Sequence, residues 1–215
     1  MKAAVPNEDD RGRIRDTRPE DREDEPAAVD RDEASILGFH TRRLLAEPVA
    51  PDDLGELCRM QRDPRVMATL GDRLFTTEET RVLLDRFLAH WDRHGYGMWV
   101  LRHRTTAEFV GRAGLHRCEV EGELEVELAY ALRAEFWNQG LTSEVSGEIL
   151  KRAFDGLGLP SVVAFTVTSN GASQRVLEKL GFELERHFLR ARLPHVLYRI
   201  RKPRDTARHR ATGAE

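Results

Sequence analysis

The sequence has few cysteines and no long apolar run. Cys58 and Cys118 are the only two cysteines in 215 residues, and they form no paired motif, so neither a disulfide framework nor a zinc site is predicted. No stretch approaches the ~20 apolar residues that a membrane-spanning helix requires, and the charged N-terminus lacks the apolar centre of a signal peptide. These absences favour a cytoplasmic protein with no membrane partner.

The sequence also lacks an excess of basic residues. With 34 Lys and Arg against 37 Asp and Glu, the formal net charge is -3. Domains that bind nucleic acid by neutralising phosphates usually carry a basic excess, so no nucleic-acid partner is expected. A local site for an anionic cofactor is still compatible with this charge. The eight histidines show no metal-ligand spacing, and no metal is predicted.

Acidic charge is concentrated at the N-terminus. Residues 1–33 hold 12 acidic and 7 basic side chains and almost no large apolar ones. Such a segment buries too little surface to offset its ordering entropy, so residues 1–35 are predicted to be a disordered tail. The simpler interpretation is a solvated spacer, and the alternative is an interaction tail. Residues 203–215 are again polar and predict a flexible C-terminus, which leaves a single domain at 36–202.

Strand and helix patterns alternate between the two tails. A strand-like start at Leu44 and a helix from Pro51 to Met60 come first, and a capping box of Thr76 and Glu79 then begins a helix that Gly95 ends. Strands are predicted at 98–102, 109–118, 124–132, 162–168, 182–188 and 196–200, with helices at 142–154 and 172–180. The pattern predicts an α/β domain with a mixed sheet.

One turn in this pattern has the features of an anion site. Residues 136–143 lie between a predicted strand and a predicted helix and include Gly140. A turn at a helix N-terminus directs free backbone N–H groups at one point, and the helix dipole adds partial positive charge there. This arrangement suits a pyrophosphate. A single glycine before a helix is, however, more often only a tight turn.

The residues around this turn resemble a known family. The sequence resembles the acetyl-CoA motif of GNAT acetyltransferases at 127–130 (ELAY), Leu132 and 136–144. The branch of that family that it resembles includes the ribosomal-protein N-terminal acetyltransferases. The segment 170–182 (NGASQRVLEKLGF) is similar to the other hallmark of that branch. Shorter matches at 41–44, 109–115 and 196–198 extend the resemblance from about Leu37 to Arg201.

The resemblance implies a single GNAT-fold domain, with a central mixed, mostly antiparallel sheet flanked by helices. It implies that acetyl-CoA donates an acetyl group to a primary amine, on a protein N-terminus or a small molecule, by direct attack in a ternary complex. The cofactor contacts that it implies are Leu132, Asn138, Gln139, Gly140, Leu141, Thr142, Ser143 and Asn170. A homodimer is left open. The alternative is a non-catalytic module of the same fold that binds acyl-CoA or a partner.

The resemblance also implies catalytic roles. An ordinary ammonium must lose a proton before it attacks a thioester, and Glu127 would be the base; otherwise it is an exposed strand carboxylate that balances an arginine. Asn170 would contact the pantetheine arm or orient a water, or it caps the following helix. Ser173 would serve the departing thiolate near Leu177, where many family members have a tyrosine acid, or it is a helix cap.

Two further positions depart from the family pattern. Trp137 stands where the family usually has Arg or Gln, as is common in this branch. Thr142 stands where Gly or Ala normally follows the turn, and its methyl and hydroxyl groups need room beside the pyrophosphate. Thr142 and the missing tyrosine favour the non-catalytic alternative, whereas Gln139, Gly140 and Asn170 favour the enzyme.

Overall fold

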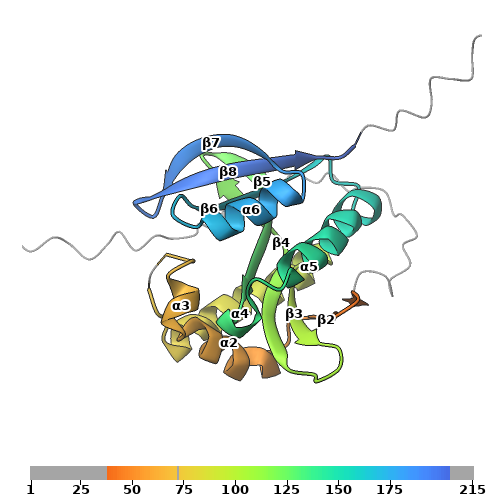
Figure 1. Cartoon of the computed structure of the whole chain (residues 1–215), viewed down its shortest axis with the longest axis vertical. Coiled ribbons are helices and arrows are strands. Elements are labelled where there is room, and N and C mark those ends of the chain that lie inside the picture. The colour runs from red at the N-terminus through yellow and green to blue at the C-terminus, as the bar shows by residue number, and fades with distance from the viewer. Residues whose placement is uncertain (1–37, 72, 204–215) are drawn as a thin grey trace, which may run out of the picture. The chain divides into compact units, whose positions relative to one another are not determined.

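The computed structural model describes residues 38–203 except residue 72 (Figure 1). The predicted tails, 1–35 and 203–215 apart from Pro203, lie outside the described residues. The strands are β1 (Phe39–His40), β2 (Leu44–Pro48), β3 (Met98–His103), β4 (Phe109–Val120), β5 (Glu123–Leu132), β6 (Ser161–Val167), β7 (Glu183–Arg190) and β8 (Leu193–Arg201). The helices are α2 (Leu54–Gln61), α3 (Pro64–Met67), α4 (Thr77–His94), α5 (Leu141–Lys151) and α6 (Gly171–Lys179), with short 3₁₀ turns η1 (Pro51–Asp53) and η2 (Ala134–Phe136).

The strands form one mixed sheet in the order β1-β2-β3-β4-β5-β6-β8-β7. Every neighbouring pair is antiparallel except β5 and β6, which run parallel. The register of β4 with β5 continues from Gly111–Leu132 to Val120–Glu123, whereas β5 and β6 share the single pair Glu127–Val163. The mostly antiparallel mixed sheet is confirmed, and its two halves are joined by this single pairing.

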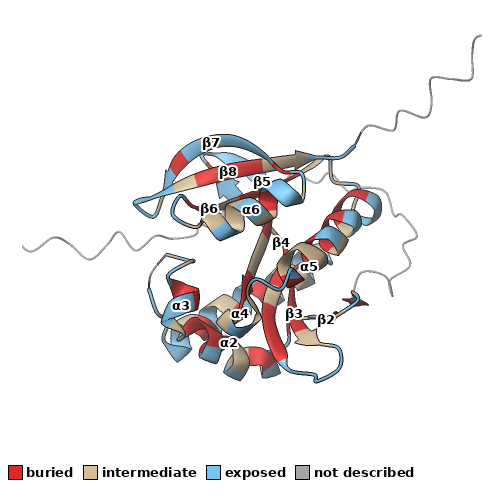
Figure 2. Cartoon of the chain, in the orientation of Figure 1, coloured by how far each residue is buried: buried red, intermediate tan, exposed pale blue. Residues whose placement is uncertain are grey.

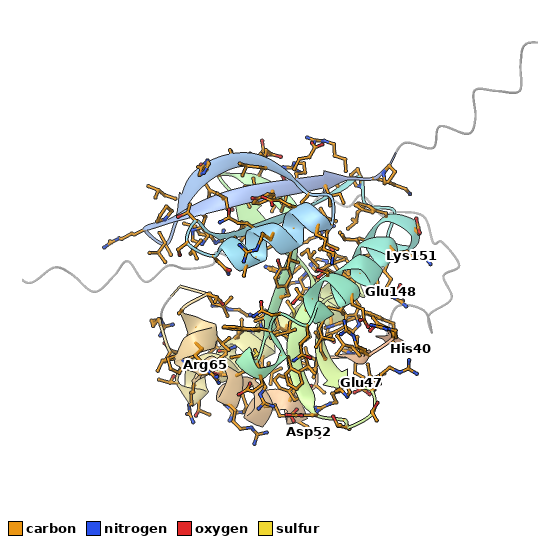
Figure 3. The ribbon with its side chains drawn as sticks, in the orientation of Figure 1. His40, Glu47, Asp52, Arg65, Glu148 and Lys151 are labelled. Carbon is orange, nitrogen blue, oxygen red and sulfur yellow. The ribbon has the colours of Figure 1, made fainter. Side chains whose placement is uncertain are left out.

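Helices cover both faces of the sheet (Figures 1 and 2). Successive strand side chains point to opposite faces, so Trp99 and Leu101 of β3 join the core under α5 and α6, while Met98 and Val100 join the core under α2 and α4. On α5 the buried stripe faces the sheet, and the opposite stripe carries charged residues, among them Glu148 and Lys151 (Figure 3). None of the described helices is both long and apolar enough to cross a membrane.

Local signals account for the ends of α4. The Thr76 hydroxyl accepts from the Glu79 N–H at 3.1 Å, and the Glu79 carboxylate accepts from the Thr76 N–H at 2.8 Å. Gly95 ends the helix with φ 68°, a left-handed conformation that glycine adopts without steric cost. The predicted capping box and the predicted stop are both confirmed.

Some elements differ from the sequence prediction. The regular α5 ends at Lys151 and passes into a wider π turn at Arg152–Gly156, instead of continuing to Phe154. This turn buries Ala153 and Phe154, and Lys202 Nζ donates to the Phe154 carbonyl at 2.8 Å. The prediction also missed α3, because four residues are too few to show helical periodicity.

Gly114 lies where β4 packs closely against β3, and we expect Gly114→Ala to destabilise the domain by about 3 kcal/mol or more. A Cβ there would lie 2.3 Å from the Gly97 carbonyl oxygen and 2.6 Å from the Met98 Cα, so backbone would have to move. Urea unfolding measures the loss. Gly147→Ala is the matched control: nothing lies within 4 Å of its added Cβ, and a helical Gly→Ala change should stabilise by about 0.5–1 kcal/mol. Equal stability of the two variants would contradict this account of β4.

Candidate active site

The site is built around the parallel strands β5 and β6, which pair only at Glu127 and Val163. Beyond Glu127 and Val163 the two parallel strands no longer pair with each other. The chain continues from β5 through η2 into α5, and from β6 into α6. The N-termini of both helices therefore follow the carboxyl ends of the diverging strands, which is where ligands bind in open parallel sheets.

The turn before α5 has the geometry of an anion site. Asn138 has φ 58° and Gly140 has φ 75°, so both adopt the left-handed conformation. Gly140 is the N-cap residue and offers no side-chain hydrogen bond. The backbone N–H groups of Leu141, Thr142 and Ser143 therefore have neither an intrahelical partner nor a cap, and the positive end of the helix dipole lies beside them.

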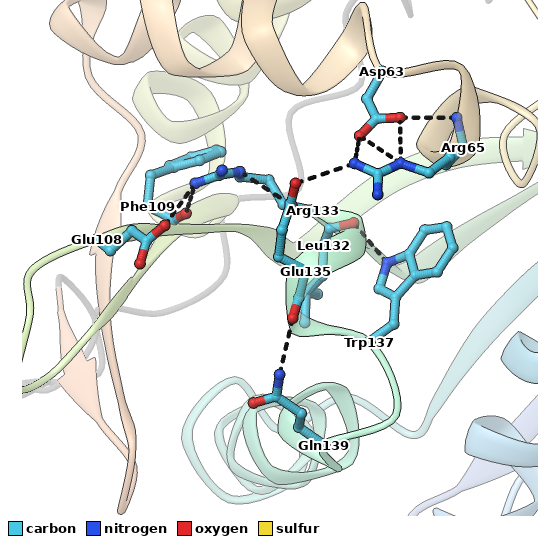
Figure 4. Close-up of polar contacts among 9 residues, drawn as sticks. All are labelled: Asp63, Arg65, Glu108, Phe109, Leu132, Arg133, Glu135, Trp137 and Gln139. Atoms are coloured by element: carbon cyan, nitrogen blue, oxygen red, sulfur yellow. Dashed lines mark hydrogen bonds and ion pairs between the residues drawn. The ribbon is translucent and has the colours of Figure 1, made fainter.

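Side chains fix the shape of this turn (Figure 4). Trp137 Nε1 donates to the Leu132 carbonyl at 2.8 Å, and Gln139 Nε2 donates to the Glu135 carbonyl at 2.9 Å. The side chains of Leu132 and Leu141 are buried in the hydrophobic core. Of the predicted cofactor contacts, these two leucines therefore have only their backbone available to a ligand.

An ion pair that the sequence prediction missed ties the turn to β2. Arg43 Nη1 donates to the Gln139 carbonyl at 2.9 Å, and Arg43 Nε lies 2.7 Å from Glu144 Oε2. Thr41 Oγ1 and the Arg43 backbone N–H both donate to Glu144 Oε1, at 2.6 and 2.8 Å. Burial opposes ionisation of Glu144, yet these hydrogen bonds hold its pKa below the ordinary value. The 41–44 segment was the only sequence signal for this contact.

A second set of ion pairs anchors η2 from the other side. Arg65, on α3 (Figure 3), lies 2.6 Å from Asp63 and 3.1 Å from Glu135. Arg133 contacts Glu108 at 3.0 Å (Figure 4). These exposed pairs are individually weak, but together they join α3 and β4 to the segment that leads into the turn.

Glu127 is a buried carboxylate. It is 6% exposed, and its Oε2 lies 3.0 Å from His116 Nε2, opposite it in the β4–β5 register. Arg112 adds positive charge nearby; burial lowers the pKa of Arg112 to about 10, while Glu127 acts in the opposite direction. The alternative of an exposed carboxylate is therefore wrong, since Glu127 is buried, but its charge does act on an arginine, Arg112, as well as on His116.

Three potential metal ligands meet at this point. Single ligand atoms of His116, Cys118 and Glu127 all lie within 4.8 Å of one another. Burial and the Glu127 charge both raise the pKa of the Cys118 thiol above its ordinary value. Spacing along the chain did not indicate this cluster, because the β4–β5 register creates it. The absence of a metal remains a prediction.

The start of α6 brings three polar side chains together. Asn170 Oδ1 accepts from the Ser173 N–H at 3.0 Å, and Asn170 Nδ2 donates to the Thr69 carbonyl at 3.4 Å. Asn170 is thus the N-cap, one of the two roles expected for it, and the interpretation of Ser173 as the cap is wrong. The Ser173 hydroxyl instead lies 2.8 Å from the Tyr130 hydroxyl of β5. Burial raises the pKa of Tyr130 to about 12. The sequence prediction gave Tyr130 no role.

Comparisons with known proteins agree with this geometry. A family model described as an acetyltransferase (GNAT) domain matches residues 43–183. The uncharacterized N-acetyltransferase YoaA of Bacillus subtilis is 26% identical over 148 residues, which are 68% of this chain and 83% of that protein.

Solved structures share the fold. The ribosomal-protein-S5-alanine acetyltransferase from Vibrio fischeri superposes with a TM-score of 0.64 at 17% identity, over 77% of this chain and 97% of that one. The spermidine N-acetyltransferase from Vibrio cholerae, in complex with CoA and spermine, gives a TM-score of 0.61 at 15% identity, over 74% and 95% of the two chains. The family match covers most of the chain, and the turn before α5, the separated β5 and β6 and the capped α6 lie within it. The chain therefore belongs to the GNAT acetyltransferase family.

Proposed function

We propose that the chain transfers an acetyl group from acetyl-CoA to a primary amine, with both substrates bound at once. The observation that carries this proposal is the uncapped N-terminus of α5, together with the buried Glu127 carboxylate at the single point where β5 and β6 pair. The same surroundings supply an anion site and a base, both of which a ternary complex of this kind needs.

The cofactor runs along β5 in this proposal. Its pyrophosphate accepts from the N–H groups of Leu141, Thr142 and Ser143, with Asn138, Gln139 and Gly140 shaping the turn. The pantetheine arm passes Leu132 and Asn170 and places the thioester near Glu127. Five residues of strand separate Leu132 from Glu127, about 17 Å of chain, which matches an extended pantetheine arm.

The reaction needs a base for the attacking ammonium and a hydrogen-bond donor for the departing thiolate. Glu127, directly or through one water, takes a proton from the ammonium, and the neutral amine attacks the thioester carbonyl. The carbon–nitrogen bond forms and the carbon–sulfur bond breaks, with its electron pair left on sulfur. Ser173, at the positive end of α6, is placed to donate a hydrogen bond to that thiolate.

The acceptor is a protein N-terminus or a small amine. Among the structural neighbours, one is named for a ribosomal-protein alanine and another for spermidine, so the shared fold serves both kinds of acceptor. A primary amine is the chemistry that these acceptors have in common. A possible homodimer and a cytoplasmic location remain predictions from the sequence.

A thiol-release assay tests the proposal. Acetyl-CoA is incubated with the protein and a panel of N-terminal peptides, polyamines and amino acids, and mass spectrometry identifies the acetylated product. We expect release of free CoA that depends on one class of amine. Tight binding of CoA without release for any amine would favour the alternative, a non-catalytic acyl-CoA-binding module.

A further inference from the structure

The position expected to supply an acid has no polar group in this protein. Leu177 is 1% exposed and packs in the core between α6 and the sheet. Ser173 lies one helical turn earlier, on the same side of α6. Ser173 therefore carries a hydroxyl on the face of α6 where Leu177 has none.

A second hydroxyl reaches Ser173 from across the opening. Tyr130 lies on β5 three residues beyond Glu127, the point at which β5 and β6 stop pairing. Its hydroxyl is 2.8 Å from Ser173 Oγ and 3.4 Å from the Ser173 carbonyl. The hydrogen bond thus joins β5 to the first turn of α6, on both sides of the proposed path of the pantetheine arm.

We propose that Tyr130 is a positioning residue for the leaving group: its hydroxyl donates to Ser173 Oγ and thereby turns the Ser173 proton toward the sulfur of the acyl donor. The inference rests on the proposed function and assigns a role to a side chain outside the proposed acetyl-CoA contacts. Ser173 touches the sulfur, and Tyr130 acts only through Ser173.

Both hydroxyls satisfy the requirements of this arrangement. Tyr130 keeps its proton at every working pH, because burial raises its pKa to about 12, and a phenol is a stronger donor than an alcohol. Tyr130 is also the only side-chain partner of Ser173 Oγ within residues 38–203. Once Tyr130 donates to it, the Ser173 proton is free for a ligand. A chain of two hydroxyls polarises the terminal O–H and strengthens its hydrogen bond.

The step consumes no group on the protein. As the carbon–sulfur bond breaks, the electron pair stays on sulfur, and the thiolate accepts a hydrogen bond from Ser173. The amine loses two protons, one to Glu127 before the attack and one from nitrogen once the carbon–nitrogen bond has formed. Both pass to solvent, and solvent returns one of them to the thiolate, so each turnover releases one proton. Ser173 and Tyr130 end the cycle protonated, as they began it.

Tyr130→Phe, Ser173→Ala and the double variant test the inference. We expect Ser173→Ala to lower kcat by ~10²-fold, as for the loss of one donor to developing charge, and Tyr130→Phe to lower kcat by ~10-fold. The double variant should be no slower than Ser173→Ala alone, because Tyr130 acts through Ser173. The KM for the amine and the calorimetric affinity for CoA should stay at wild-type values. Ser173→Thr, which keeps a hydroxyl, should recover part of the activity that Ser173→Ala loses.

Tyr198→Phe is the matched control. Tyr198 is another buried tyrosine whose hydroxyl reaches α6, where it donates to Glu178 Oε1 at 3.2 Å. Its loss should leave kcat unchanged. Suppose that the wild type is active. The inference, but not the proposed function, would then be overturned if Tyr130→Phe had the wild-type kcat, or if the effects of Tyr130→Phe and Ser173→Ala on kcat were additive in the double variant. A loss of CoA affinity parallel to kcat would do the same, since it would mark Tyr130 as a structural tie. A wild type that releases no thiol would overturn the proposed function itself.

Discussion

Replacing Glu127 with glutamine is expected to lower kcat by ~10²-fold or more, the usual contribution of a general base. Glutamine keeps the size of the side chain and much of its hydrogen bonding, but it cannot accept the proton of the ammonium. Binding of acetyl-CoA should stay close to wild type. Steady-state rates and calorimetry separate the two quantities.

The pH dependence gives a second readout of the same change. The wild-type rate should rise with pH until the base or the amine is deprotonated. The Glu127→Gln variant should require a higher pH, because only amines that are already neutral in solution can react; for a lysine-like amine the relevant pKa is about 10.4.

A neighbouring carboxylate on β5 supplies the control. Glu123 belongs to the same strand but is exposed, so Glu123→Gln should leave the rate and its pH profile unchanged. If Glu127→Gln instead matches wild type at pH 7, Glu127 is structural, and the amine is activated by solvent or bound in its neutral form.

Gly140→Val is expected to weaken binding of CoA by ~10-fold or more, since a left-handed conformation costs an ordinary residue about 1–2 kcal/mol and a β-branched one more. Gly140 has φ 75°, so the substitution is strained by its backbone conformation. Steric contact adds little, because the nearest atom to an added Cβ is Arg43 Nη2 at 3.7 Å, an ordinary van der Waals distance. Strain rather than a clash would therefore reshape the turn and redirect its N–H groups. The added side chain would also hinder approach of the pyrophosphate to the backbone.

Gly122→Val separates strain at the site from strain in general. Gly122 has φ 89°, nothing lies within 4 Å of its added Cβ, and it lies in the connection between β4 and β5. The Gly122→Val variant should lose about as much stability in urea unfolding as Gly140→Val does, but its calorimetric affinity for CoA should not change. A folded Gly140→Val protein that binds CoA as wild type does would show that the pyrophosphate site is wrongly placed.

Local signals in the sequence were sufficient for most of the elements. The Thr76–Glu79 box, the stop at Gly95 and the Asn170 cap are set by residues within four positions of one another, so their hydrogen bonds form wherever the helix forms. The left-handed turn before α5 belongs to this class, because Gly140 and the start of α5 are adjacent in the chain. The short α3 and the π turn after α5 carry no such periodic signal.

The sequence by itself therefore determined the α/β class, the order of the elements, the turn before α5 and the family resemblance. Tertiary structure alone decided which groups meet across strands: Glu127 with His116, Tyr130 with Ser173, and Arg43 with Glu144. The physical reason is that strand register and the docking of α5 and α6 bring together residues 11, 43 and 101 positions apart. A shift of one residue in the register of β5 would turn its side chains to the opposite face and break the Glu127–His116 and Tyr130–Ser173 contacts without changing any local signal.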